Sequence, residues 1–215
     1  MQANLVTLIR IFLVFLVIGL YKVNTIACGI AVLLTIATLY MDALDGIIAR
    51  RLGIESDLGA MFDIAGDRIV ENVFWVYFAS IGMASVWAAA IVVARSFLID
   101  WLRTLAFVDA GQTAFGSKTM MRSRWAKALV SSRFSRALYG FTKAVVFVYL
   151  GAVLLIQSGQ AEYGWSIGVS TEWLLLIGQA IVWLTVVMCL VRGVPVIWDS
   201  QDVLFRKMFP GLLRD

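Results

Sequence analysis

Four aspartates stand close together in a chain that is otherwise mostly hydrocarbon: Asp42, Asp45, Asp63 and Asp67. The first two are three residues apart, and the last two are four residues apart. On a helix, these spacings place side chains on one face. Ligand sets made only of oxygen favour a hard divalent ion such as Mg²⁺, Mn²⁺ or Ca²⁺. The residue types and their spacing therefore predict a divalent-metal site.

The hydrocarbon on either side of these acids suggests how they are held. Ile26–Tyr40 is apolar, and so is Ile69–Ala79 apart from two polar residues. An ionised carboxylate inside a membrane helix costs roughly 2.5–3.5 kcal/mol on insertion scales, so the four aspartates need cations. Arg50 alone cannot neutralise them. We therefore expect two membrane helices, joined by a short turn, that each present a carboxylate pair near the same membrane surface.

Other metal chemistry is not expected. The chain has no His, and its two cysteines, Cys28 and Cys189, lie in other apolar runs. A zinc site built from nitrogen and sulfur ligands therefore does not fit the sequence. A disulfide is not expected either, because both cysteines fall within apolar spans.

Two glycines flank the acidic face. Gly46 follows Asp45, and Gly59 lies one turn before Asp63. A glycine beside a charged ligand lets a bulky substrate approach the backbone. The alternative is that both glycines only permit close helix packing, which is common in membranes.

The whole stretch resembles the signature of the CDP-alcohol phosphotransferase family, D-x-x-D-G-x-x-A-R-x8-G-x-x-x-D-x-x-x-D. The chain matches this pattern at every fixed position: Asp42, Asp45, Gly46, Ala49, Arg50, Gly59, Asp63 and Asp67. The resemblance implies an all-helical membrane protein that moves a phosphoalcohol group from a CDP-linked donor, often CDP-diacylglycerol, to an alcohol. CMP is the leaving group, and the resemblance also implies a homodimer.

The resemblance also implies roles for individual residues. Asp42, Asp45 and Asp63 would hold two Mg²⁺ or Mn²⁺ ions, which can clamp a transferring phosphoryl group. Asp67 would both bind metal and act as general base for the acceptor hydroxyl. The residues that would bind the CDP donor are Asn4, Thr7, Gly46, Arg50, Ser56 and Gly59.

Three of these donor assignments rest on further observations. Arg50 could grip a diphosphate with two parallel hydrogen bonds. Asn4, Thr7 and Arg10 recur every third residue and share a helix face, as in a stretch that family members place near the nucleotide. The alternative for this face is a helix start at the membrane surface, with Arg10 reaching the headgroups. The alternative for Ser56 is a simple helix N-cap.

Length and composition predict one integral membrane domain over residues 1–215. The chain is 61% hydrophobic and only 15% charged, a composition typical of a polytopic membrane protein. Six apolar runs give an all-α fold with six transmembrane helices, at about 4–21, 26–49, 60–80, 84–107, 136–157 and 172–191. The first run lacks a charged leader and a convincing cleavage site, so we expect a retained helix.

The distribution of basic residues predicts the orientation. Of the 18 Lys and Arg residues, only Lys22 falls in a connection on the side away from the aspartates. By the positive-inside rule, both termini and the aspartates then lie at the cytoplasmic face. The basic loop 108–135 would lie on anionic headgroups, and the tail 193–215 would form an interfacial amphipathic segment. Membrane lipids, and no nucleic acid, are the expected large partners.

The acceptor is predicted from a second set of basic residues. Arg133, Arg136 and Lys143 enter the fifth span at helical spacing, and Arg95 could join them from the fourth. Such a group would suit a phosphorylated acceptor. The start of the chain and Ala94–Arg95 resemble phosphatidylglycerophosphate synthases, although Ser96 replaces their usual Glu.

These likenesses favour glycerol 3-phosphate as the acceptor. The Asp67–Arg68 pair resembles phosphatidylinositol phosphate synthases instead, so inositol phosphate is the first alternative and serine or another alcohol the second. A divalent-cation transporter is a remote alternative from another class, since acids inside a membrane can line ion paths. Against it, the acids cluster at one surface and no span is visibly broken or repeated.

Overall fold

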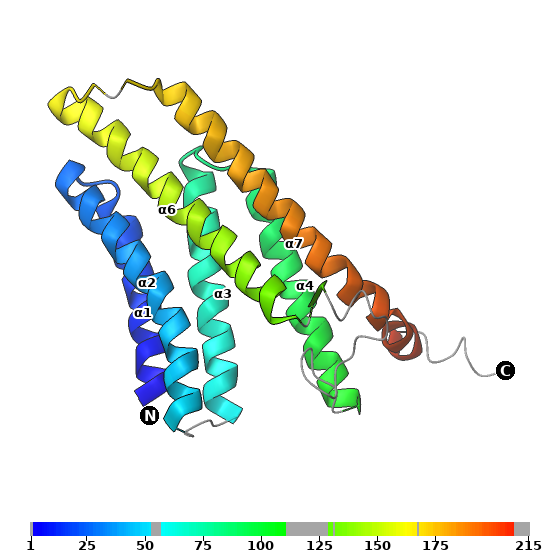
Figure 1. Ribbon diagram of the computed structural model, residues 1–215. Coiled ribbons are helices and arrows are strands. Elements are labelled where there is room, and N and C mark those ends of the chain that lie inside the picture. Colours follow the sequence, from blue (N-terminus) through cyan, green and yellow to red (C-terminus); the bar gives the residue numbers. More distant parts are fainter. Residues whose placement is uncertain (1, 53–56, 111–128, 131, 167, 209–215) are drawn as a thin grey trace. The chain divides into compact units, whose positions relative to one another are not determined.

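The computed structural model describes residues 2–52, 57–110, 129–130, 132–166 and 168–208 of the 215-residue chain, with some of the helical side chains, including 42–52, left undescribed. The described residues form helices and no strand, which confirms the all-α prediction for this part of the chain. The helices, shown in Figure 1, are α1 (Gln2–Leu20), α2 (Thr25–Leu52), α3 (Asp57–Ser80), α4 (Val86–Ala110), α6 (Arg133–Tyr163) and α7 (Thr171–Met208).

Two of these helices are long and apolar enough to cross a membrane. They are Phe134–Tyr163 within α6 and Thr171–Asp199 within α7, and only 33% and 28% of their most apolar windows are buried inside the protein. The core helix of a soluble protein would be mostly buried, so these low fractions favour contact with lipid. Shorter apolar helices cover Leu5–Leu20 and Thr25–Met41 in the described part. The count of six spans and the orientation stay predictions.

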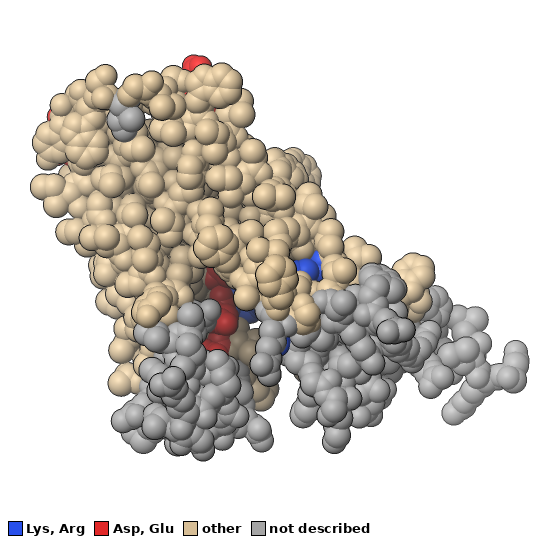
Figure 2. Space-filling view, viewed as in Figure 1, with Lys and Arg blue, Asp and Glu red and all other residues tan. Residues whose placement is uncertain are grey.

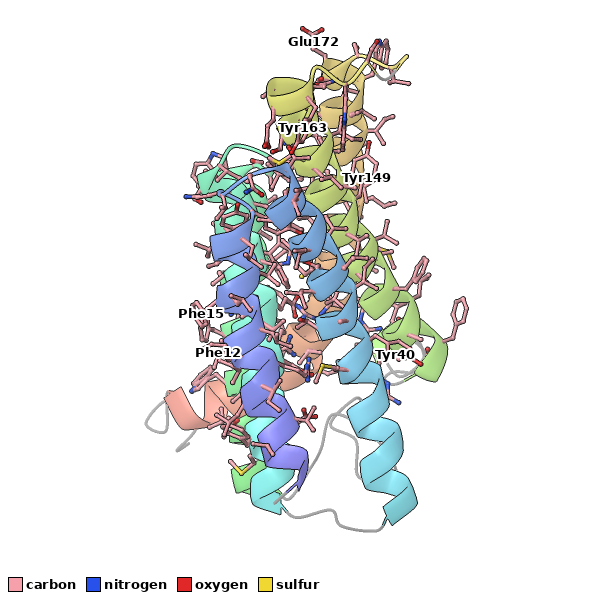
Figure 3. All side chains as sticks on the ribbon, turned by 90° about the vertical axis from the view of Figure 1, so that its left-hand side faces the viewer. Phe12, Phe15, Tyr40, Tyr149, Tyr163 and Glu172 are labelled. Atoms are coloured by element: carbon pink, nitrogen blue, oxygen red, sulfur yellow. The ribbon has the colours of Figure 1, made fainter. Side chains whose placement is uncertain are left out.

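Large apolar side chains cover much of the described surface. Phe12 on α1 is 70% exposed, and Trp87 on α4 is 75% exposed. Figure 3 shows Phe12 and Phe15 pointing outward from α1, and most of the described surface in Figure 2 carries no charge. Soluble monomers rarely expose so much contiguous apolar surface, whereas lipid tails can cover it.

The chain divides into two compact units. Unit 1 comprises Met1–Ala89 and Lys143–Val182, and unit 2 comprises Ala90–Thr142 and Trp183–Asp215. In unit 1, α1 packs against both α2 and α3. Because the connections between these three helices are short, the start of α1, the last turns of α2 and the first turns of α3 lie at the same end of the unit (Figure 1).

Aromatic side chains form the core of unit 1. Phe74 of α3 stacks on Phe147 of α6 with ring centroids 4.9 Å apart, and Trp75 meets the same Phe147 edge-on at 5.5 Å. All three are buried. Tyr21, which follows α1, stacks on Tyr77 at 5.7 Å. These contacts fix the second half of α3 against α6 and the end of α1. The acidic first half of the same helix is therefore held on a rigid support.

The turn after α3 explains where that helix ends. Gly82 has a φ of 76°, in the left-handed region that glycine adopts without a steric penalty. The amide of Met83 donates to the Phe78 carbonyl, and the amide of Gly82 donates to the Ala79 carbonyl. This is the hydrogen-bond pattern of a glycine-terminated helix C-terminus. It satisfies the last carbonyls before the chain turns into α4.

Unit 2 has a smaller core and shows one difference from the sequence prediction. Ile99 and Leu102 of α4 pack with Val130 and with Val196 of α7. The predicted last span stops at residue 191, whereas α7 continues as one helix to Met208 with Pro195 inside it. Pro195 lacks a backbone N–H and so removes one helical hydrogen bond, but it does not end the helix. The interfacial role of 193–215 stays a prediction.

Candidate functional site

The site begins where α1 touches α3. A Cβ added to Gly66 would overlap Cγ2 of Thr7, so the two helix backbones approach closely at this point. Thr7 is buried and β-branched, which leaves its methyl group little freedom to move away. Glycine is therefore required at position 66 for the observed approach, and this contact sets the height of α1 relative to the acidic face of α3.

Arg10, one turn further along α1, reaches the acids of α3. Its Nη2 donates to Oδ1 of Asp67 at 2.9 Å, and its Nη1 lies 3.7 Å from Oδ1 of Asp63. The Arg10 side chain is only 3% exposed, whereas Asp63 and Asp67 are 44% and 40% exposed. One buried guanidinium thus pairs with two carboxylates that remain accessible. The predicted pairing of Asp63 and Asp67 on one helix face is present.

The other acidic pair lies on α2. The backbone of Asp42 and Asp45 belongs to the last part of α2, at the same end of unit 1 as the start of α3. The side chains of both residues lie outside the described part. Among the described side chains, no three His, Cys, Asp or Glu residues come together in a group able to hold a metal ion. The four-carboxylate site therefore stays a prediction.

The two described acids do fit a divalent cation by their chemistry. Both Asp63 and Asp67 offer hard oxygen donors, and their partial exposure leaves room for a further ligand. Arg10 donates a hydrogen bond to Oδ1 of Asp67. A carboxylate has two oxygens and about four acceptor positions, so it can accept this hydrogen bond and ligate a metal ion at the same time.

A second ion-pair group lies one turn deeper on α3. Glu71 is 6% exposed, and its Oε2 accepts from Nζ of Lys143 at 2.7 Å and from Nη1 of Arg68 at 3.0 Å. Glu71 therefore pairs with cations from two helices, α3 and α6. Lys143, predicted to bind the acceptor, is held in this pair. Because two cations meet one buried carboxylate, the negative charge of Glu71 is fully compensated inside the protein.

Unit 2 contains a cluster of arginines around one ring. The guanidinium carbon of Arg95 lies 5.9 Å from the ring centroid of Tyr139, and that of Arg192 lies 5.6 Å from it. Arg192 is buried and donates to the carbonyls of Leu129 and Val130 at 3.0 and 3.3 Å, and to the Ser135 hydroxyl. Cation–π contacts of this kind stabilise a guanidinium that has lost water.

Arg95 is less engaged than Arg192. Its side chain packs on the backbone of Gly193, where an added Cβ would lie 3.0 Å from Nε. Within the described residues, its Nε is buried without a hydrogen-bond partner. Arg136, from the same set of predicted acceptor residues, is exposed on α6. Arg95 and Arg136 thus belong to unit 2, together with the buried Arg192.

The remaining predicted residues are only partly described. Thr7 faces Gly66 rather than an open surface, and Gly59 lies in the first turn of α3. The side chains or backbone of the others fall outside the described residues: Asn4, Gly46, Arg50, Ser56 and Arg133. Their donor and acceptor roles stay predictions.

Two contributors, Gly66 and Arg192, escaped the sequence prediction of the site, whereas Arg10 was expected there as part of a helix face near the nucleotide. Arg10 was grouped with Asn4 and Thr7 by spacing, and that periodicity was the signal for its inward direction. Gly66 precedes Asp67, so its closeness to a predicted catalytic acid was a signal. Arg192 follows an apolar run as a single basic residue. From sequence alone, such a side chain is expected to extend toward the lipid headgroups, so its burial inside the protein could not be foreseen.

Comparison with known families agrees with the signature. Residues 1–191 match the family model of CDP-alcohol phosphatidyltransferase. Members of this family transfer a phosphatidyl group from a CDP-alcohol to an acceptor in phospholipid biosynthesis. The family match and the two helices that are long and apolar enough to cross a membrane together indicate a membrane protein. Because the match covers most of its 215 residues, the chain belongs to the CDP-alcohol phosphatidyltransferase family.

Proposed function

We propose that this protein transfers the phosphatidyl group of CDP-diacylglycerol to glycerol 3-phosphate at the cytoplasmic face of a membrane, with two Mg²⁺ or Mn²⁺ ions. The observation that carries the proposal is the state of the α3 acids. Asp63 and Asp67 lie on one face, both contact the buried Arg10, and both stay accessible. Accessible carboxylates can bind metal ions, whereas paired and buried acids such as Glu71 cannot do so readily.

The metal ligands would be Asp42, Asp45, Asp63 and Asp67. When bound, the ions would stabilise the negative charge that develops on the phosphoryl oxygens and on departing CMP. Asp67 takes the proton from the acceptor hydroxyl, and no His exists in the chain to replace it. A bond forms between that hydroxyl oxygen and the phosphorus of the phosphatidyl group. The bond from this phosphorus to the oxygen of CMP breaks, and CMP leaves with that oxygen.

The remaining residues would bind and orient the donor. Arg50 grips the diphosphate, and Gly46 and Gly59 let the nucleotide approach the backbone. Asn4 and Ser56 complete the donor site by family position. Exposed apolar side chains on the helices of unit 1 suit acyl chains that extend sideways into the bilayer. A donor with two lipid tails can therefore reach a site at the membrane surface.

The choice of acceptor rests on the arginines of unit 2. Arg95 has a buried Nε without a hydrogen-bond partner in the described part of the chain, and a phosphate offers the oxygens such a group lacks. Arg133 and Arg136 add positive charge. Lys143 would add to it if it contacted the acceptor as well as Glu71. An acceptor without a phosphate, such as serine, would not need this charge. Glycerol 3-phosphate and inositol phosphate both would, and the sequence resemblance favours the first.

The test is a panel of acceptors. Purified protein in detergent, supplied with CDP-diacylglycerol and Mg²⁺, should release CMP with glycerol 3-phosphate. The same preparation should be slow with inositol phosphate, serine and water. Preference for inositol phosphate would overturn the choice of acceptor alone. Absence of CMP release with every acceptor and either metal would overturn the transferase assignment for this chain.

A pair of variants tests the acceptor residues. Replacing Arg95 with Met should raise the KM for glycerol 3-phosphate about tenfold or more, because a charged hydrogen bond is worth about 1.5–3 kcal/mol. The KM for CDP-diacylglycerol should change little. Lys22→Met is the matched control, because it removes one exposed positive charge on the connection between α1 and α2. Equal changes in both KM values for Arg95→Met would remove Arg95 from the acceptor site.

A further inference from the structure

The turn that joins α6 to α7 carries three exposed aromatic side chains that nothing above assigns. Tyr163 at the end of α6 is 53% exposed, Trp165 is 44% exposed, and Trp173 in the first turn of α7 is 63% exposed. We propose that these three side chains, the aromatic anchor, bind the boundary between headgroups and acyl chains on the membrane surface opposite the acids of α3. This inference depends on residence in a membrane and not on the proposed function.

The two long apolar helices place this turn at the edge of the hydrocarbon layer. The apolar stretch of α6 ends at Tyr163, and that of α7 begins at Thr171, so the chain leaves and re-enters the apolar layer between these residues. Figure 3 shows Tyr163 and Glu172 at this end of the unit. Trp and Tyr are enriched where hydrocarbon meets headgroups, because each has an apolar ring and a polar N–H or O–H group.

A glycine-terminated helix end holds Trp165 in a fixed position. Gly164 has a φ of 67°, in the left-handed region that glycine adopts readily. Its amide donates to the Gln160 carbonyl at 3.2 Å, and the amide of Trp165 donates to the Gly159 carbonyl at 3.3 Å. These two hydrogen bonds form a Schellman motif, in which the residue after the glycine packs back on the helix. The Trp165 ring accordingly lies on Gly159, where an added Cβ would overlap it.

Two further contacts stiffen the turn. The ring of Tyr163 stacks on that of Trp165 with centroids 6.2 Å apart. The Thr171 hydroxyl donates to Oε1 of Gln160 at 2.9 Å, which joins the start of α7 to the end of α6. Side chains that are already ordered lose little conformational freedom on binding, so the turn presents a preorganised aromatic surface to lipid.

The charge of the turn favours one kind of lipid surface. Residues 158–173 contain no Lys or Arg and two acids, Glu162 and Glu172. Attraction to anionic headgroups depends on Lys and Arg near the surface, and this segment offers neither. The aromatic anchor therefore fits a surface of zwitterionic phospholipid.

A hydrogen bond to α2 relates the aromatic anchor to the acidic end of the unit. Oε2 of Glu162 accepts from the amide of Thr25 at 2.8 Å, so the start of α2 lies beside the end of α6. The apolar stretch Thr25–Met41 spans roughly 25 Å at 1.5 Å per residue, and Asp42 follows it. This length is close to the roughly 30 Å of a bilayer's hydrocarbon core. An anchor at one surface thus sets the depth of the acids at the other.

The experiment locates each tryptophan in the bilayer by ¹⁹F NMR. Full-length protein containing 5-fluorotryptophan is placed in phosphatidylcholine nanodiscs, and two resonances are assigned from Trp165→Phe and Trp173→Phe. Phosphatidylcholine with a nitroxide near the headgroup, or near the end of the acyl chain, is then added. Both resonances should be broadened about threefold or more by the first label relative to the second, because interfacial rings stay away from the bilayer centre.

Two glycine variants test the rigid turn. Gly159→Ala should displace the Trp165 ring, so its broadening by the headgroup label should change about twofold or more while that of Trp173 holds. Gly168→Ala is the matched control in the same turn, because nothing lies within 4 Å of an added Cβ there. It should leave both resonances unchanged. An unchanged Trp165 resonance in Gly159→Ala would contradict the fixed position of that ring.

The outcomes decide the inference without any measurement of activity. Preferential broadening of both resonances by the headgroup label supports the aromatic anchor. Equal or stronger broadening by the label at the chain end would place the rings in the hydrocarbon and overturn it. Broadening by neither label, as expected for rings in water or against a second copy of the chain, would overturn it as well. Stronger broadening only after anionic phosphatidylglycerol is added would contradict the assignment to a zwitterionic surface.

Discussion

Asp67 and Glu71 are one turn apart on the same helix, yet their surroundings give them different roles. Glu71 is buried and meets two cations, Arg68 and Lys143. Asp67 is 40% exposed and shares Arg10 with Asp63. A buried, doubly paired acid holds helices together, because breaking such a pair leaves an isolated charge. An accessible acid can exchange ligands and protons, so the proposed catalytic role suits Asp67 better than Glu71.

Asp67→Asn tests that assignment at the level of one atom. The amide keeps the shape of the side chain and can still accept from Arg10, but it cannot take a proton from the acceptor. We expect kcat to fall about 10²–10⁴-fold, the usual range for a lost general base. The affinity for CDP, measured by calorimetry, should change much less. Full turnover by Asp67→Asn would remove Asp67 from the role of base.

Glu71→Gln tests the structural role of the neighbouring acid. The substitution leaves Lys143 and Arg68 beside a neutral side chain in a buried place. We expect a loss of about 2–3 kcal/mol in stability, somewhat below the 3–5 kcal/mol of a fully orphaned buried charge, because Arg68 is partly exposed. The measurement is thermal unfolding in detergent, in which Glu71→Gln should have a lower midpoint than the natural protein.

The matched control removes the other side of the pair. Adding Lys143→Met to Glu71→Gln takes away the cation that the first change leaves unpaired. Apolar replacement of a buried pair is often neutral, so the double variant should unfold at a higher temperature than Glu71→Gln alone. If the double variant were less stable than either single variant, Glu71 and Lys143 would not act as a pair.

At the scale of elements, the contact between α1 and α3 positions the site. Gly66 and Thr7 meet one turn before Arg10, so any shift of α1 also moves the guanidinium relative to Asp67. Gly66→Ala would place a methyl group where Thr7 Cγ2 already lies, and the rigid side chain of Thr7 cannot swing aside at low cost. We expect a lower unfolding temperature and a kcat reduced about tenfold or more by the displaced acid.

A second substitution should relieve this clash. Thr7→Ser removes the overlapping methyl group and keeps the hydroxyl, so Gly66→Ala with Thr7→Ser should recover most of the stability and kcat. Thr7→Ser alone is the control and should cost little. If the double variant stayed as impaired as Gly66→Ala, the close approach of α1 to α3 would not be the cause.

The helices themselves could largely be predicted from the sequence, because apolar runs of membrane length have few alternatives. The predicted span at 136–157 and helix α6 differ by only a few residues at each end. The main difference is α7, which continues past Pro195. A proline predicts a helix end from local rules, but packing of Val196 against α4 offsets the missing hydrogen bond.

The site was predictable where it depends on spacing along one helix. Asp63 and Asp67 share a face because they are four residues apart, and this follows from helix geometry alone. The ion pairs of Arg10 and Lys143 join residues 57 and 72 positions apart. No local rule selects such partners. The hydrogen bonds of Arg192 to Leu129 and Val130 are of the same kind, so they emerge only from the fold.

For the whole molecule, the two units have different charge. Unit 1 has accessible acids on α3, and unit 2 has arginines gathered around Tyr139. The exposed apolar side chains on the described helices fit a membrane, from which a lipid-linked donor would come.

The most direct test of the account is diffraction from crystals grown with Mn²⁺ and CDP, collected where manganese scatters anomalously. We predict two manganese peaks between α2 and α3, within bonding distance of carboxylate oxygens of Asp42, Asp45, Asp63 and Asp67, with the diphosphate of CDP against the ions. Aspartates that point into separate surroundings, with no manganese between them while CDP is bound, would contradict the account.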